Sequence, residues 1–97
     1  MNYIRVNTEY FNYGLKPIDA LVLAVVESFN SDNKLCYMTN EQLADMFSVT
    51  KATVARSIDH LVKYGFITRN TKTIKKDGEF TRRRTLTIVP VQNAQEE

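Results

Sequence analysis

Two groups of side chains in the second half of the chain could bind a polyanion. The first group follows Thr50 and mixes small, polar and basic residues: Lys51, Ala52, Thr53, Arg56, Ser57, His60 and Lys63. The second group flanks Asp77-Gly78 and is cationic throughout: Lys72, Lys75, Lys76, Arg82, Arg83 and Arg84. Lysine and arginine neutralise phosphates and release counterions, and arginine can also donate two hydrogen bonds to O6 and N7 of guanine. These residue types therefore predict the binding of nucleic acid.

The charge distribution along the chain favours the same partner. Residues 1–50 carry a net charge of −3, whereas residues 51–84 carry ten Lys and Arg against three acidic residues, a net +7. The total of +2 conceals this asymmetry. A polyanion partner for the basic half follows from it, and the alternative is a basic surface that is merely solvated.

Within residues 51–63, different side chains suit different contacts with duplex DNA. Ala52 and Thr53 can approach thymine methyl groups, and Arg56 can form the paired hydrogen bonds to guanine. Lys51 and Ser57 lie on the flanks of this surface in a helical projection and could reach bases or phosphates. Most of the affinity should come from the lysines and arginines that face phosphates.

Simpler functions remain open for three of these residues. Thr53 could cap its own helix, and Arg56 could pair with Asp59 or Asp45 in the free protein. His60 is expected to contact a phosphate or lie at the surface, because it has no neighbouring nucleophile or second metal ligand in the sequence.

Several classes of function lack their sequence signature. The chain has no glycine-rich phosphate loop, no metal-ligand cluster and no catalytic Ser-His-Asp or Cys-His spacing. Its one cysteine, Cys36, excludes an internal disulfide framework, and we expect an inert, partly buried thiol. We therefore expect no enzyme, cofactor, metal or small-molecule ligand. The longest apolar run, Ala20 to Val26, is too short to span a bilayer, and no signal peptide is evident, so a cytoplasmic location is expected.

The elements that would position these residues begin with an aromatic segment and a helix. Residues 1–15 have mixed periodicity and predict an extended arm, strand-like at Tyr3–Val6 and broken by Gly14. Pro17 suits the first position of a helix whose apolar residues recur at helical spacing up to the polar stretch 30–33. Residues Leu35–Met38 predict one short strand.

Two further helices follow in close succession. Thr39 is an expected N-cap for a short helix at Asn40–Phe47, with the glutamine three residues later completing a capping box. Ser48 then occupies a turn position where a left-handed backbone is needed. A longer helix is predicted from after Thr50 to Tyr64, where a glycine stops it. A short helix, a tight turn and a longer second helix form the pattern of a helix-turn-helix.

The last element can be assigned a register. Asp77-Gly78 is a strong signal for a two-residue hairpin turn, which pairs Lys76 with Glu79 and, counting back, Ile67 with Ile88. The apolar pairs then share one face at the base, and the cations lie towards the tip. The sequence therefore predicts an α+β domain, mainly helical with a small sheet: a winged helix-turn-helix of three helices and a β-hairpin wing at residues 16–90. The arm at 1–15 precedes it, and 91–97 form a flexible tail.

Over about residues 15–90, the sequence resembles the winged-helix domains of plasmid and phage replication initiators, or replisome organisers, of Gram-positive bacteria. The residues that carry this resemblance are Tyr37, Thr39-Asn40, Leu43-Ala44, Val49-Thr50, Thr53-Val54, Arg56, Ile58, Leu61 and Gly65-Phe66-Ile67. The resemblance implies that Lys51, Thr53, Arg56 and Ser57 face origin repeats. It also implies that the basic wing holds the flanking backbone.

The resemblance further implies a role in replication initiation or maintenance of a plasmid, phage or other mobile element, with replication proteins as partners. Transcriptional regulators share the scaffold, so transcriptional regulation is the alternative role. A third possibility is a winged helix that serves as a protein-interaction module. Such initiators usually continue into a C-terminal domain, so we expect either a small stand-alone regulator or the DNA-binding part of a longer initiator. A homodimer is expected, because two half-sites raise specificity.

Overall fold

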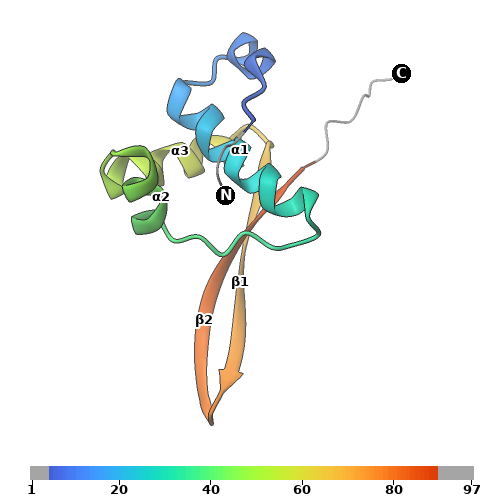
Figure 1. Cartoon of the computed structure of the whole chain (residues 1–97), viewed down its shortest axis with the longest axis vertical. Coiled ribbons are helices and arrows are strands. Elements are labelled where there is room, and N and C mark those ends of the chain that lie inside the picture. Colours follow the sequence, from blue (N-terminus) through green and yellow to red (C-terminus); the bar gives the residue numbers. More distant parts are fainter. Residues whose placement is uncertain (1–4, 90–97) are drawn as a thin grey trace.

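Three α-helices lie above a long two-stranded hairpin that projects away from them (Figure 1). The computed structural model describes residues 5–89. The elements in chain order are η1, a 3₁₀-helix at Thr8–Tyr13, α1 at Pro17–Ser31, α2 at Asn40–Phe47, α3 at Lys51–Lys63, β1 at Ile67–Lys76 and β2 at Glu79–Ile88. This arrangement is the predicted winged helix-turn-helix of the α+β class.

Helix α1 is the scaffold of the core. Pro17 occupies its first turn, and the carboxylate of Asp19 accepts the backbone N–H of Lys16 at 3.0 Å. That bond satisfies a donor that the start of a helix would otherwise leave free. The middle of α1 is wholly enclosed, with Val22, Leu23 and Val26 at 0% exposure.

The caps of α2 and α3 form as the sequence predicts. Gln42 N–H donates to Oγ1 of Thr39 at 3.1 Å, and the Gln42 side chain accepts the Thr39 N–H at 2.9 Å. Ser48 ends α2 in the left-handed region, at φ 57° and ψ 44°. Thr50 then caps α3 by accepting the N–H of Thr53 at 3.2 Å. Three residues, 48–50, thus form the whole turn between the two helices.

The hairpin has the predicted register throughout. Ile67 pairs with Ile88 and Lys76 with Glu79, around a turn in which Asp77 and Gly78 both have positive φ. Positive φ at both central residues matches the right-handed twist of the strands. The buried residues of the two strands, Ile67, Thr85 and Leu86, lie at or near the base of the hairpin.

The core joins all three helices to the hairpin base and η1. Leu43 of α2 and Leu61 of α3 are at 0% exposure, as is Leu86 of β2. The buried members of this cluster are Tyr10, Leu15, Val22, Leu23, Val25, Val26, Cys36, Leu43, Ala44, Val54, Ile58, Leu61, Ile67 and Leu86. Ala44 of α2 is a small member of this cluster at 4% exposure, and the cluster leaves the outward side of α3 uncovered.

Two predicted extended segments differ from the structure. Residues Leu35–Met38 do not form a strand: a single bridge joins Cys36 to Leu86, whose N–H donates to the Cys36 carbonyl at 3.0 Å. The arm at residues 1–15 is not extended throughout, because Thr8–Tyr13 form a 3₁₀-helix that ends at Gly14. The ring of Tyr10 in η1 packs edge-on against Phe66, with centroids 5.6 Å apart. This tertiary contact favours the compact turn over an extended arm.

Two other expectations fall at the ends of the chain. The strand expected at Tyr3–Val6 begins outside the described residues, and the tail at 91–97 lies wholly outside them. Among residues 5–89, no helix has the length and apolar character needed to cross a membrane.

Candidate nucleic-acid interface

The outward side of α3 is open to solvent. Lys51, Ala52, Arg56 and Lys63 are exposed, and Thr53 is partly exposed. The opposite side of the helix, with Val54, Ile58 and Leu61, is buried in the core. The amphipathic pattern therefore presents small residues at the start of α3 and cations further along, with nothing packed over them in the described part of the chain.

Arg56 is free to bind an external acceptor. Its guanidinium lies 3.5 Å from Oγ1 of Thr53, and within residues 5–89 no carboxylate forms an ion pair with it. Of the two carboxylates considered as partners, Asp59 instead pairs with Arg69 at 2.7 Å. The Thr53 hydroxyl lies 2.9 Å from that of Thr50, which is the true cap of the helix. Thr53 is therefore not the cap of α3, and Arg56 does not pair with Asp59 or Asp45.

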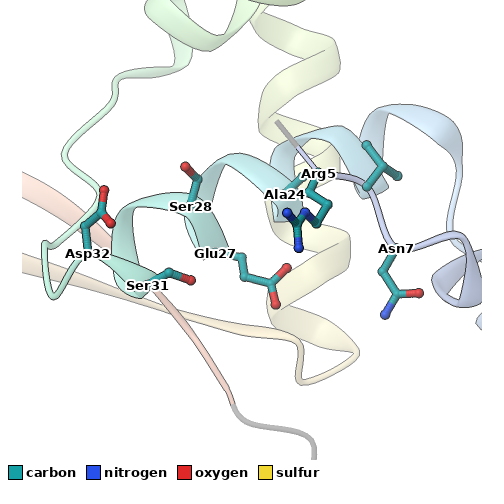
Figure 2. Close-up of a pocket in the computed structure, with 8 residues that line it drawn as sticks. Arg5, Asn7, Ala24, Glu27, Ser28, Ser31 and Asp32 are labelled. Carbon is teal, nitrogen blue, oxygen red and sulfur yellow. The ribbon is translucent and has the colours of Figure 1, made fainter. Parts of the chain in front are cut away.

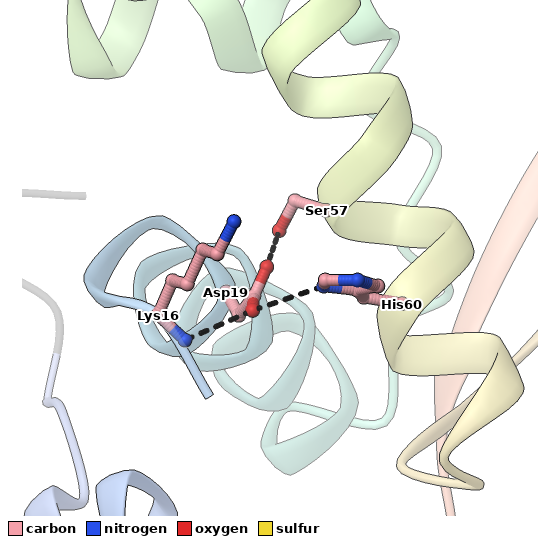
Figure 3. A network of polar contacts seen from close by, with 4 residues as sticks. All are labelled: Lys16, Asp19, Ser57 and His60. Atoms are coloured by element: carbon pink, nitrogen blue, oxygen red, sulfur yellow. Dashed lines mark hydrogen bonds and ion pairs between the residues drawn. The ribbon is translucent and has the colours of Figure 1, made fainter. Parts of the chain in front are cut away.

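Ser57 does not lie on this outward surface. It is 2% exposed, and its hydroxyl donates a hydrogen bond to Oδ1 of Asp19 at 2.6 Å (Figure 3). The expectation that Ser57 reaches bases or phosphates is wrong, because its position on α3 faces α1. A buried hydroxyl needs a partner, and the carboxylate of Asp19 supplies one.

His60 lies at the edge between the two surfaces. Its Nδ1 is 3.6 Å from Oδ2 of Asp19, and its side chain is 42% exposed. The ring also packs beside Tyr64, with centroids 5.6 Å apart. Figure 3 shows Asp19 between Lys16, Ser57 and His60, so one carboxylate organises the contact of α1 with α3. Contact of His60 with DNA stays a prediction.

The register of the hairpin divides its cations between two faces. Opposite residues share a face, and faces alternate along each strand. Arg69 lies opposite Leu86 and bonds Asp59 of α3, so their face is the one turned towards α3. Alternation from this pair places Lys75, Arg82 and Arg84 on the same face and Lys72, Lys76 and Arg83 on the other.

The side chain of Arg84 forms hydrogen bonds within the protein. Its guanidinium donates to the backbone carbonyl of Met38 and to Oδ1 of Asn40, at the start of α2. Desolvation lowers the pKa of this half-buried group from its ordinary value, and the nearby charge of Arg69 lowers it too, against an opposing influence of Cys36. The expectation that Arg84 is a phosphate ligand of the wing is therefore corrected, since both of its terminal amino groups donate to acceptors within the protein.

Two other wing cations rest on aromatic rings. The guanidinium of Arg83 lies 5.0 Å from the ring centroid of Tyr37, and Nζ of Lys75 lies 5.6 Å from that of Phe80. Phe80 is 70% exposed. The predicted register already placed Lys75 opposite Phe80, whereas no local signal connects Tyr37 to Arg83. Lys72, Lys76 and Arg82 are exposed.

A pocket of about 730 Å³ lies elsewhere on the molecule. Figure 2 shows it against α1, with Glu27 of that helix and Arg5 and Asn7 of the N-terminal segment among the residues that line it. It contains none of the predicted DNA-binding residues. Across residues 5–89, no three potential metal ligands among His, Cys, Asp and Glu come together.

Comparison with known proteins identifies the helical part of the chain. A family model described as a helix-turn-helix domain matches residues 13–67, more than half of the sequence. The match spans α1, α2 and α3 and stops at the first residue of β1. No curated protein and no solved structure gives a significant match.

Proposed function

The chain belongs to this helix-turn-helix domain family of DNA-binding domains, and we propose that it binds duplex DNA in a sequence-specific manner. In this proposal α3 enters the major groove and the hairpin lies along the flanking backbone. The observation that carries it is the open outward side of α3, where Ala52 is exposed and the exposed guanidinium of Arg56 has no ion-pair partner among residues 5–89.

Affinity and specificity would come from different residues. The exposed cations at the ends of α3 and on the hairpin would neutralise phosphates on any sequence: Lys51, Lys63, Lys72, Lys75, Lys76 and Arg82. Arg83, which lies over the ring of Tyr37, would do the same. A plot of log affinity against log salt concentration has a negative slope, and each neutralised phosphate steepens that slope by about 0.9. Base reading would fall to Ala52, Thr53 and Arg56 in the first two turns of α3.

The first experiment is a titration of a random duplex at low and moderate salt, followed by gel shift or fluorescence anisotropy. Steeply salt-dependent binding is the expected result. Absence of binding at micromolar protein in low salt would contradict the proposal and favour a protein-interaction module. Selection of bound sequences from a random library then tests specificity, because a sequence-specific protein enriches one site.

For the biological role, we propose replication initiation or maintenance of a mobile element. The support is the resemblance of the sequence from Thr39-Asn40 to Gly65-Phe66-Ile67 to replication initiators, and a transcriptional regulator is the alternative. Repeated sites from the selection would favour binding to origin repeats.

We also propose that the protein binds DNA as a homodimer. Phe11 and Tyr13 of η1 and Tyr64 at the end of α3 are exposed aromatic side chains that a second copy could cover. Sedimentation at micromolar concentration tests this, and a purely monomeric profile both free and on DNA would contradict it.

A further inference from the structure

We propose that Arg84 is a positioning residue, which holds the hairpin at a set angle to α2, and that the neighbouring Arg82 binds phosphate instead. This inference rests on the proposed function, because it assigns separate tasks to two arginines of the same DNA-binding surface. They are two residues apart on β2 and share the face turned towards α3.

The contacts of Arg84 join β2 to the first residue of α2 and to the segment that precedes this helix. Its two acceptors, the Met38 carbonyl and Oδ1 of Asn40, stand on either side of Thr39, the N-cap of α2. The guanidinium is half-buried there, while Arg82 is exposed. Arginine suits this position because its planar group presents donors in a fixed fork, which a lysine ammonium cannot reproduce.

The length of the hairpin makes its angle important. Each strand has ten residues, and the burial is confined to the base, where Ile67 and Leu86 are at 1% and 0% exposure. Ten residues of strand span about 33 Å, so a tilt of about 10° at the base displaces the tip by about 6 Å. That displacement is comparable to the spacing of neighbouring phosphates. A clamp at Arg84, in the middle of β2, therefore decides whether the cations near the tip and the outward side of α3 meet the same duplex.

Charge-conserving variants separate a clamp from a phosphate contact. Arg84→Lys keeps the charge but loses the fork, so we expect random-duplex binding to weaken about three- to tenfold with little change in salt dependence. Arg82→Lys is the matched control, and it should stay within about twofold of wild type, because lysine also binds phosphate as a point charge. Arg82→Ala should lower the slope of the salt dependence by about one.

A neutral partner variant gives a second, independent readout. Asn40→Ala removes one acceptor of Arg84 and leaves the charge of the protein unchanged. We expect it to weaken DNA binding, and we expect the double variant with Arg84→Lys to lose less than the product of the two single effects. Non-additivity of this kind is the signature of residues that act through one another.

Thermal unfolding and amide hydrogen exchange complete the test. Faster exchange of the hairpin amides in Arg84→Lys, with the helices still folded, supports the clamp. Wild-type affinity in Arg84→Lys, together with a slope lowered by about one in Arg84→Ala, would overturn it and make Arg84 a phosphate contact. If the wild-type protein binds no duplex, the proposed function fails. The clamp role of Arg84 is then tested by amide hydrogen exchange of the hairpin alone, and unchanged exchange in Arg84→Lys overturns it.

Discussion

The hydroxyl of Ser57 donates a hydrogen bond of 2.6 Å to the carboxylate of Asp19, across 38 positions of sequence. Asp19 is 1% exposed, and the same carboxylate accepts the backbone N–H of Lys16. One buried group therefore caps α1 and also holds α1 against α3. The bond lies on the side of α3 that faces α1, away from the proposed base-reading surface.

The first prediction concerns the stability that this carboxylate provides. Asp19→Ala should lower the free energy of unfolding by about 2–3 kcal/mol, since it leaves the buried Ser57 hydroxyl and the Lys16 N–H without an acceptor. Urea unfolding measures the change. Ser57→Ala should cost about 1 kcal/mol and leave DNA affinity unaltered, because Ser57 does not face outward. A large loss of DNA binding in a folded Ser57→Ala protein would contradict this assignment.

The second prediction concerns sequence preference. Arg56→Ala should reduce discrimination at one base pair of the selected site by about 1–3 kcal/mol and change random-duplex binding much less. Competition titrations of the selected site against single-base variants measure this. Lys63→Ala is the control on the same helix, and it should weaken all duplexes alike. Equal loss on every sequence in Arg56→Ala would show that Arg56 binds phosphate.

The third prediction compares the two faces of the hairpin. Lys75→Ala with Arg82→Ala removes two cations from the face turned towards α3, and Lys72→Ala with Lys76→Ala removes two from the other face. The first pair should lower the slope of the salt dependence by about two, and the second pair by less. Equal slopes for the two double variants would mean that the duplex does not lie along the α3 side of the hairpin.

The fourth prediction concerns stability at alkaline pH. Desolvation raises the pKa of the Cys36 thiol, which is 0% exposed, although a backbone hydrogen bond from Met38 and the charge of Arg84 oppose the shift. The folded state then holds the thiol proton more tightly than the unfolded chain does. The resulting stabilisation is fully present below the unfolded pKa of about 8.5 and is lost as pH rises towards the folded pKa.

Urea unfolding between about pH 8 and 9.5 measures this effect, in a range below the ordinary pKa of tyrosine. The wild-type free energy of unfolding should fall across the range, and Cys36→Ala should start lower and fall less. Parallel curves for the two proteins would exclude the thiol as the cause. Tyr10, whose pKa burial also raises, would add its own loss at higher pH.

Much of this protein could be predicted from the sequence because the signals involved are local. The capping box at Thr39, the left-handed turn at Ser48 and the Asp77-Gly78 turn each depend on residues within a few positions of one another. Once the turn is placed, strand alternation defines every pair in the hairpin back to Ile67 and Ile88. The helix-turn-helix, the wing and the exposed Arg56 follow from such short-range rules.

The tertiary structure alone decided which polar residues are free to bind DNA. Ser57 and Arg84 have the residue types of a DNA-binding surface, but their partners Asp19 and Asn40 lie 38 and 44 positions away. Packing likewise turned the segment Thr8–Tyr13 into a 3₁₀-helix and left only one bridge at Cys36. Residue type and spacing indicate what a side chain can bind, whereas the groups that surround it in the fold determine whether that capacity is already used.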